Sequence, residues 1–360
     1  MTENQKNLEA LRILDRAVLG IKSLPEAVNA TLNQAIDLLG VDAAIIRIIN
    51  HDMQKFERVF EQKFLTHPVN QANFKTTEQH AMTAWREKRL VYIQKLIETE
   101  TFASKSQQDS HRFKSYLANP LQFEGKVFGV LEVFSHKTLM PSREWLAFYE
   151  SFTAECGLLL PGIIELDKIT QDYNELTLSY DATLELLSKV LDLHEHQTGE
   201  VTKQAADLSV ALANELGVDA WLLPHIRRGA LLHDIGNISV PDSVLLKTGQ
   251  LTSEEWETIR NHTIYAHDLL SNVRYLQPAL ELITHHHERW DGNGYPKGLK
   301  GKQIPVVARI FTVVDVWFSL ISPRPYRPAW RKEDALNYIA SQANLQFDPE
   351  IVEKFVNLEK

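Results

Sequence analysis

Histidines are concentrated in the C-terminal half of the chain, where nine of the 14 lie between residues 194 and 287. Three of them, His285–His287, are adjacent and lead into a glycine-rich turn sequence, Glu288–Pro296. Neutral imidazole is the commonest metal-binding side chain, so this cluster predicts a metal site. A lone histidine is more often a satisfied core residue. Three in a row, beside a turn that could hold a substrate, are harder to explain in that way.

Two aspartates that are also predicted to point into the interior strengthen this interpretation. Asp315 lies in an apolar run, and a lone buried carboxylate is costly unless a cation or strong donors meet it. A helix cap or a distant arginine would be the alternative partner. Asp234 has two oxygens and could bridge two metals about 3.5–4 Å apart. Mixed imidazole and carboxylate ligands suit Fe, Mn or Zn. The candidate ligands on four predicted helices are His233, Asp234, His262, His286, His287 and Asp315.

Length and composition set the frame for this site. The 360 residues, with a net charge of −9, predict two domains, since domains usually contain about 100–200 residues. The acidic balance argues against a nucleic acid or an anionic membrane as the main partner, but it allows a small anionic ligand at a local site. The single cysteine, Cys156, excludes an intramolecular disulfide. With no secretion signal and no apolar run that could span a bilayer, we expect a cytoplasmic protein.

The N-terminal part mixes helical and strand patterns, which is typical of an α+β domain. Val, Ile and Phe are frequent in the segments that we interpret as strands. The predicted elements are two helices within residues 5–40, paired strands over Ala43–Asn50 and Phe56–Phe64, a helix over Thr77–Arg86, a short strand over Leu90–Ile93, a loop over Glu98–His111, a hairpin over Leu121–Phe134 and a helix over Ser142–Leu160.

A linker helix is predicted after residue 160. Pro161 and Gly162 break the preceding helix, and apolar residues then recur at alternating three- and four-residue spacing, which indicates a heptad seam. We interpret this segment as a parallel coiled-coil stalk that joins two domains in a homodimer. The alternative is a helix that packs on its own domain. The seam residues are Leu166, Ile169, Tyr173, Leu176, Tyr180, Leu184 and Leu187.

The rest of the chain is predicted to be an all-α bundle. Its helical patterns carry the candidate ligands on apolar faces, so the bundle would bring them together. The predicted domains are residues 1–160, a linker over 161–190 and a helical domain over 191–360. The predicted helices of the last domain cover Val201–Leu216, Leu222–His233, Ser253–Asn272, Ala279–Glu288, Val306–Leu320 and one or two further segments within 333–358.

Two family resemblances follow from these motifs. The hairpin and helix over Asn119–Leu160 resemble the end of a GAF domain, a sensory module that binds a small ligand or mediates dimer contacts; a ligandless GAF domain is an equal alternative. His233-Asp234, His262, the turn Glu288–Pro296 and Asp315 resemble the HD-GYP family over residues 190–355. That resemblance implies hydrolysis of cyclic di-GMP to pGpG and in many cases on to GMP, with two or three metals, often iron or manganese.

Site roles follow from the HD-GYP resemblance residue by residue. His233, Asp234 and Asp315 would hold one metal, and Asp234, His262, His286 and His287 would hold the second. Asp234 and Asn237 occupy the catalytic positions. Tyr295 would contact a guanine or shape the pocket, with a packed turn aromatic as the alternative. Arg324 and Arg327 would bind phosphates, with a solvated loop as the alternative.

The sequence also departs from the family pattern. Val201 replaces a ligating histidine, Gln197 replaces a glutamate found in members with a third metal, and Asn237 replaces a lysine. Phe318 stands where an aspartate is often found. Two functions remain: a metal-dependent phosphodiesterase of cyclic di-GMP, or a non-catalytic cyclic-dinucleotide receptor that signals through the stalk. The enzyme is favoured because a binuclear site tolerates water in place of one ligand. Another cyclic dinucleotide stays open as the substrate.

Overall fold

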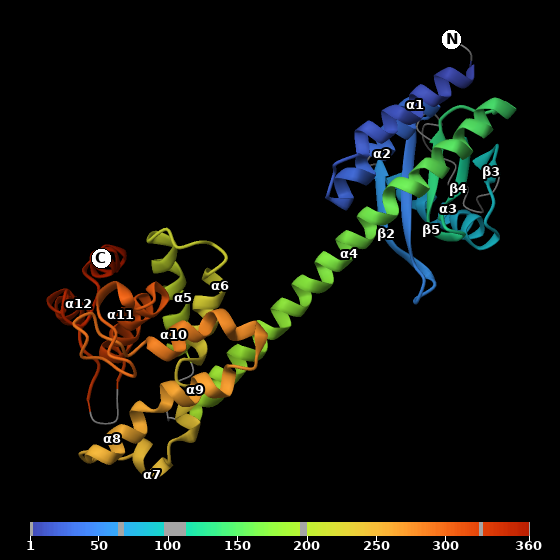
Figure 1. The fold of residues 1–360 in the computed structure, drawn as a ribbon. Helices are drawn as coiled ribbons and strands as arrows, with labels where there is room; N and C mark the ends of the chain where they lie inside the picture. The colour runs from blue at the N-terminus through green and yellow to red at the C-terminus, as the bar shows by residue number, and fades with distance from the viewer. Residues whose placement is uncertain (1–2, 64–67, 97–112, 195–199, 324–326, 360) are drawn as a thin grey trace. The chain divides into compact units, whose positions relative to one another are not determined.

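The computed structural model describes residues 3–63, 68–96, 113–194, 200–323 and 327–359 (Figure 1). Contacts divide the chain into two units, Met1–Asn174 and Glu175–Lys360. The division falls inside the predicted linker. The first unit is a sheet with helices and the second is helical, as predicted. Among the described residues, no helix has the length and apolar character that a membrane crossing requires.

The first unit is built on one antiparallel sheet in the order β2-β1-β5-β4-β3. The predicted hairpin is confirmed, because β4 and β5 pair from Ser115 opposite Ser135 to Phe123 opposite Lys126. Its turn has positive φ at Glu124, 47°, and at Gly125, 77°. Glycine adopts such a φ without strain because it has no Cβ. The strands are β1 Ala43–Asn50, β2 Lys55–Gln62, β3 Val91–Ile93, β4 Ser115–Phe123 and β5 Lys126–Ser135.

Both faces of this sheet are covered. One face packs against α1 (Glu3–Val18), α2 (Leu24–Leu39) and the first turns of α4 (Arg143–His194). The other face packs against α3 (Pro68–Glu87), which is longer than predicted. The predicted loop over 98–111 lies outside the described residues.

A buried ion pair lies on the α3 side of the sheet. Arg47 Nε is 2.5 Å from Glu132 Oε1, and the Tyr116 hydroxyl donates to Glu132 Oε2 at 2.9 Å. Burial raises the pKa of Glu132 to about 6, although Arg47 and Tyr116 act in the opposite direction. Both charged side chains are almost fully buried, so removing either partner would leave a buried charge uncompensated and would destabilise the fold.

The predicted break at Pro161 is wrong, because α4 runs from Arg143 to His194 as one helix with Pro161 inside it. A proline in a helix interior costs about 3 kcal/mol, since its ring removes one hydrogen bond and crowds the preceding turn. Leu160, Ile163 and Ile164 on either side of it pack on the apolar core of the first unit. We attribute the continuity of the helix to this packing, which offsets the cost of the proline.

The heptad seam of α4 is mostly exposed. Leu184 is buried in the core of the second unit at 8% exposure, so the alternative of packing on its own domain holds for this residue. The exposed seam residues are Leu166, Ile169, Tyr173, Leu176, Tyr180 and Leu187, at 44–67% exposure.

The second unit is a helical bundle, as predicted, with two corrections. The predicted helix Ser253–Asn272 is divided at Asn261 into α8 and α9, where η3 approaches the backbone of His262. The predicted helix Ala279–Glu288 is shorter in the structure, where α10 covers Leu280–His285 and follows the 3-10 helix η4. The elements are α5 Val201–Glu215, α6 Leu223–Leu232, the 3-10 helix η3 Ile235–Ser239, α7 Asp242–Leu245, α8 Ser253–Arg260, α9 His262–Leu270, η4 Arg274–Ala279, α10 Leu280–His285, η5 Gly301–Gln303, α11 Val306–Ile321, α12 Lys332–Ser341 and α13 Pro349–Leu358.

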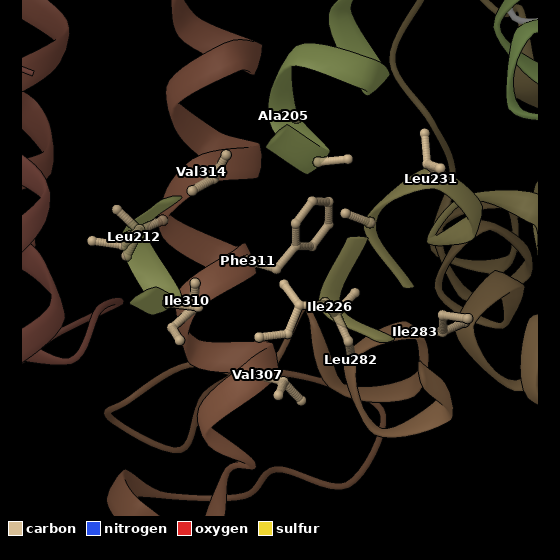
Figure 2. Close-up of a cluster of buried hydrophobic side chains, with 14 of the residues drawn as sticks. Ala205, Leu212, Ile226, Leu231, Leu282, Ile283, Val307, Ile310, Phe311 and Val314 are labelled. Atoms are coloured by element: carbon tan, nitrogen blue, oxygen red, sulfur yellow. The ribbon is translucent and has the colours of Figure 1, made fainter. Parts of the chain in front are cut away.

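Phe311 of α11 lies in the core that joins these helices. Figure 2 shows its ring among side chains of several segments, including Ala205 of α5, Ile226 of α6 and Leu282 of α10. Its ring centroid also lies 4.8 Å from that of His233 and 5.9 Å from that of His286. The apolar core therefore forms one wall of the histidine cluster.

Candidate metal centre

The centre begins where α6 ends. His233 follows the last residue of α6, and Asp234 precedes η3. The Asp234 carboxylate lies between two imidazoles: its Oδ2 is 2.9 Å from His233 Nε2, and its Oδ1 is 3.5 Å from His262 Nε2. Each oxygen thus faces a different histidine, which is the arrangement that a bridging carboxylate requires.

Backbone carbonyls orient three of the histidines. His233 Nδ1 lies 2.8 Å from the carbonyl oxygen of residue 230, His262 Nδ1 lies 2.7 Å from that of residue 259, and His286 Nδ1 lies 2.8 Å from that of residue 283. A carbonyl can only accept, so each Nδ1 carries the proton. In the neutral form of each ring, Nε2 is then the atom that can bind a cation, which is the usual orientation of metal-binding histidines.

Four side chains form a compact donor group. One ligand atom from each of Asp234, His262, His286 and His287 lies within 4.8 Å of the others. His262 Nε2 and His286 Nε2 are 3.4 Å apart, and the rings of His286 and His287 are 4.1 Å apart between centroids. This donor set fits one transition ion, because imidazole and carboxylate together suit Fe, Mn and Zn.

The protonation states of these histidines also suit metal binding. Burial, followed by the neighbouring His262, lowers the pKa of His287 to about 3. Burial and the surrounding imidazoles hold the pKa of His286 well below its usual range. Both rings are therefore neutral ligands at physiological pH. At His233 burial also acts to lower the pKa, but Asp234 and Asp315 outweigh it and raise the pKa to about 10.

Asp315 approaches the same nitrogen of His233 as Asp234 does. Its Oδ1 is 3.9 Å from His233 Nε2, so α11 brings it to the centre as predicted from its apolar neighbours. Its side chain is 28% exposed, however, so it is not fully buried. Asp315, His233 and Asp234 share a cavity of about 40 Å³ with Val201 and Asp192. A single water needs roughly 10–15 Å³, so the cavity has room for an ion and a few waters.

A glycine fixes the distance between two parts of the centre. A Cβ on Gly236 would lie 1.9 Å from the carbonyl oxygen of His262 and 2.9 Å from the amide nitrogen of Ala266. No side chain fits there, so η3 and α9 meet backbone to backbone. This contact holds Asp234, two residues before Gly236, next to His262.

The glycine-rich turn after the histidines is held from within. The buried Glu288 accepts hydrogen bonds from the backbone of Lys297 at 2.7 Å and of Leu299 at 2.9 Å. Arg289 binds Asp291 through two nitrogens, so this pair braces the turn. The turn presents Tyr295, whose ring centroid lies 4.8 Å from that of His287.

The remaining candidate residues are more scattered. The Arg327 guanidinium donates to the carbonyls of Ser319, Leu320 and Pro328, so it binds the end of α11 in this structure. Arg324 and Gln197 lie outside the described residues. Asn237 is buried within η3.

His285 lies outside the donor group, although it is as buried as its neighbours. Its Nδ1 is 3.8 Å from Glu288 Oε1, and burial lowers its pKa to about 4. The candidate ligand set therefore does not include His285.

Two contributors to the site were not singled out from the sequence. Phe311 has the same pattern as any core aromatic, so nothing marks it. Asp192 follows Leu191 in an apolar stretch near the end of α4, and it is 6% exposed. The argument that singled out Asp315, an aspartate within an apolar run, would have found it.

Comparison with known proteins finds a family match in each of the two units. Residues 22–160 match the GAF domain family, and residues 185–351 match the HD domain family. These matches confirm the two-domain resemblance predicted from the sequence.

Three named relatives each match about half of this chain. A cyclic di-GMP phosphodiesterase of Thermotoga maritima is 40% identical over 179 residues, 49% of each chain. The cyclic di-GMP phosphodiesterase response regulator RpfG of Xanthomonas campestris is 36% identical over 188 residues, 52% of this chain and 50% of the relative. The 3'3'-cGAMP-specific phosphodiesterase 2 of Vibrio cholerae is 33% identical over 169 residues, 46% of this chain and 32% of the relative. The chain thus spans half or less of the length of these relatives.

Proposed function

We propose that this chain, a GAF domain followed by an HD domain, is a metal-dependent phosphodiesterase that hydrolyses cyclic di-GMP to pGpG or GMP. The observation that carries the proposal is the donor group of Asp234, His262, His286 and His287. It lies beside a second carboxylate and imidazole, Asp315 and His233.

The donors divide into two sets that share Asp234. His262, His286 and His287 would hold one ion with it, and His233 and Asp315 would hold the other. When bound, divalent transition ions supply Lewis acidity and lower the pKa of a coordinated water. Iron and manganese suit this donor set, and zinc is a further candidate.

The chain's own residues would position the substrate. Tyr295 offers an aromatic face beside His287, on which a guanine base can stack. The Arg260 guanidinium lies over the Tyr295 ring, 5.5 Å from its centroid, where a cation and an aromatic ring attract each other. Arg327 can meet a phosphate only if it gives up its backbone carbonyls, and the phosphate role of Arg324 stays a prediction.

A second candidate is a receptor that binds the dinucleotide without cleaving it. Val201 favours it, because this apolar side chain lines the cavity next to His233 and Asp315 and offers no ligand atom. Asn237, if it holds the catalytic position of a lysine, supplies no positive charge to a phosphate.

Turnover with matched variants tests the proposal. Protein loaded with Mn²⁺ or Fe²⁺ is incubated with cyclic di-GMP, and in parallel with 3'3'-cGAMP, and the products are separated by chromatography. We expect pGpG or GMP from the wild type and none from His262→Ala. His267→Ala is the control, because His267 lies on the same helix and is exposed. Binding of cyclic di-GMP without any product would select the receptor, and faster loss of 3'3'-cGAMP would reassign the substrate.

We further propose that the chain is a cytoplasmic homodimer joined along α4. The exposed heptad residues of α4 support this arrangement, because a second copy would bury them. The GAF domain would then serve as a sensory or dimerising module for the HD domain. Sedimentation of the wild type and of a Leu166→Glu, Ile169→Glu variant would separate a dimer from a monomer.

A further inference from the structure

We propose that Asp192, at the end of α4, is an additional metal-binding carboxylate that takes the place of the ligand missing at Val201. This inference rests on the proposed metal centre but not on any particular substrate or on turnover.

The first observation is the position of Asp192. It lines the same cavity as His233, Asp234 and Asp315, and it does so together with Val201. The cavity therefore lies on the side of the centre where an apolar residue stands in a ligand position. Asp192 is contributed by α4, whereas the other donors come from the link between α6 and η3 and from α11.

The second observation is the state of its carboxylate. Asp192 is 6% exposed, and its Oδ1 accepts a hydrogen bond of 2.7 Å from the Thr202 hydroxyl. Its Oδ2 is buried and has no hydrogen-bond partner within the described ranges 3–63, 68–96, 113–194, 200–323 and 327–359. A buried carboxylate oxygen without a partner is costly, so it indicates a partner that the described residues do not supply.

The charges around the cavity indicate a cation. Three carboxylates, from Asp192, Asp234 and Asp315, line it, and among the described residues that line it His233 is the single basic side chain. A divalent ion would satisfy the free oxygen of Asp192 and reduce the repulsion among the three carboxylates. A carboxylate donor also keeps this side of the centre suited to manganese or iron.

A purely structural role is the alternative. Thr202 lies in the first turn of α5, so Asp192 could serve only to anchor that turn to α4. The two roles use different oxygens and can be separated. Asp192→Asn keeps an oxygen that accepts from Thr202 but loses the charge, whereas Thr202→Val removes the hydrogen bond but leaves the carboxylate.

The test measures Mn²⁺ alone, without a dinucleotide, by metal content per chain and by calorimetric titration of the metal-free protein. We expect two equivalents in the wild type and in Thr202→Val. In Asp192→Asn we expect one equivalent to bind at least tenfold more weakly, with the other unchanged. The double variant Val201→His, Asp192→Asn should regain the second equivalent, and it serves as the second probe if Asp192→Asn alone folds poorly.

Each outcome decides the inference. Two equivalents at wild-type affinity in Asp192→Asn would overturn it and leave Asp192 as an anchor for Thr202. Equal losses in Asp192→Asn and Thr202→Val would overturn it too. A wild type that binds no Mn²⁺ would overturn both this inference and the proposed function. Loss of one equivalent in Asp192→Asn, with no hydrolysis by the wild type, would support the inference and refute the phosphodiesterase.

Discussion

Replacing Gly236 with alanine should damage the metal centre without changing any ligating side chain. The new Cβ would start 1.9 Å from the carbonyl oxygen of His262, whereas such atoms do not approach closer than 3.0 Å. The backbones of η3 and α9 must therefore separate by about 1 Å, because close-packed interiors cannot absorb the overlap. Asp234 would move away from His262, whose Nε2 is now 3.5 Å from its Oδ1.

The size of the effect follows from coordination geometry. Metal–ligand distances tolerate errors of only about 0.2 Å, so a shift of about 1 Å should weaken Mn²⁺ binding at least tenfold, or about 1.4 kcal/mol. Overpacking should also lower the free energy of unfolding by about 1–3 kcal/mol.

Calorimetric titration with Mn²⁺ and urea denaturation of the metal-free protein measure the two effects of Gly236→Ala separately. Gly249→Ala is the matched control, since a Cβ there meets nothing within 4 Å. If Gly236→Ala bound Mn²⁺ as tightly as Gly249→Ala, the backbone contact would not set the ligand geometry and this reasoning would be refuted.

Three further changes test other parts of the structure. Val201→His should tighten binding of the second Mn²⁺ about tenfold by adding an imidazole to the cavity, and an unchanged titration would show that this position does not limit the site. The pKa of His233 is raised to about 10, so metal uptake at pH 7 should release about one proton and should weaken as the pH falls. Calorimetric titrations in buffers of different ionisation enthalpy measure the number of protons released. Metal binding without proton release would contradict this prediction. Glu132→Leu should lower the free energy of unfolding by about 3–5 kcal/mol, because Arg47 stays buried without its partner. The double variant Glu132→Leu, Arg47→Met should lose less of this free energy. A larger loss in the double variant, measured by urea denaturation, would refute this reasoning.

Much of the fold follows from patterns along the sequence. Strand alternation and the Glu124-Gly125 turn predict the hairpin of the first unit, and helical periodicity predicts most helices of the second. The continuity of α4 could not be predicted, because the proline effect is local whereas the packing that offsets it involves the sheet. The division at Asn261 depends on η3, which is distant in sequence, so periodicity within 253–272 does not reveal it.

The site could be predicted as a set of ligands but not as a geometry. Residue type and inward placement identify His233, His262 and Asp315, which α6, α9 and α11 bring together. The sequence does not reveal that Val201 and Asp192 line one cavity, because that depends on how α4 packs on α5. The sequence also predicts that Arg327 binds a phosphate, whereas in the structure its guanidinium donates hydrogen bonds to backbone carbonyls.

The hydrogen bonds that orient His233, His262 and His286 are accepted by main-chain oxygens. Every residue type supplies such an oxygen, so the residues at the accepting positions 230, 259 and 283 can be substituted during evolution as long as the helical backbone conformation is kept. The backbone conformation therefore determines the orientation of these rings, and the identity of the residues at the accepting positions does not indicate it.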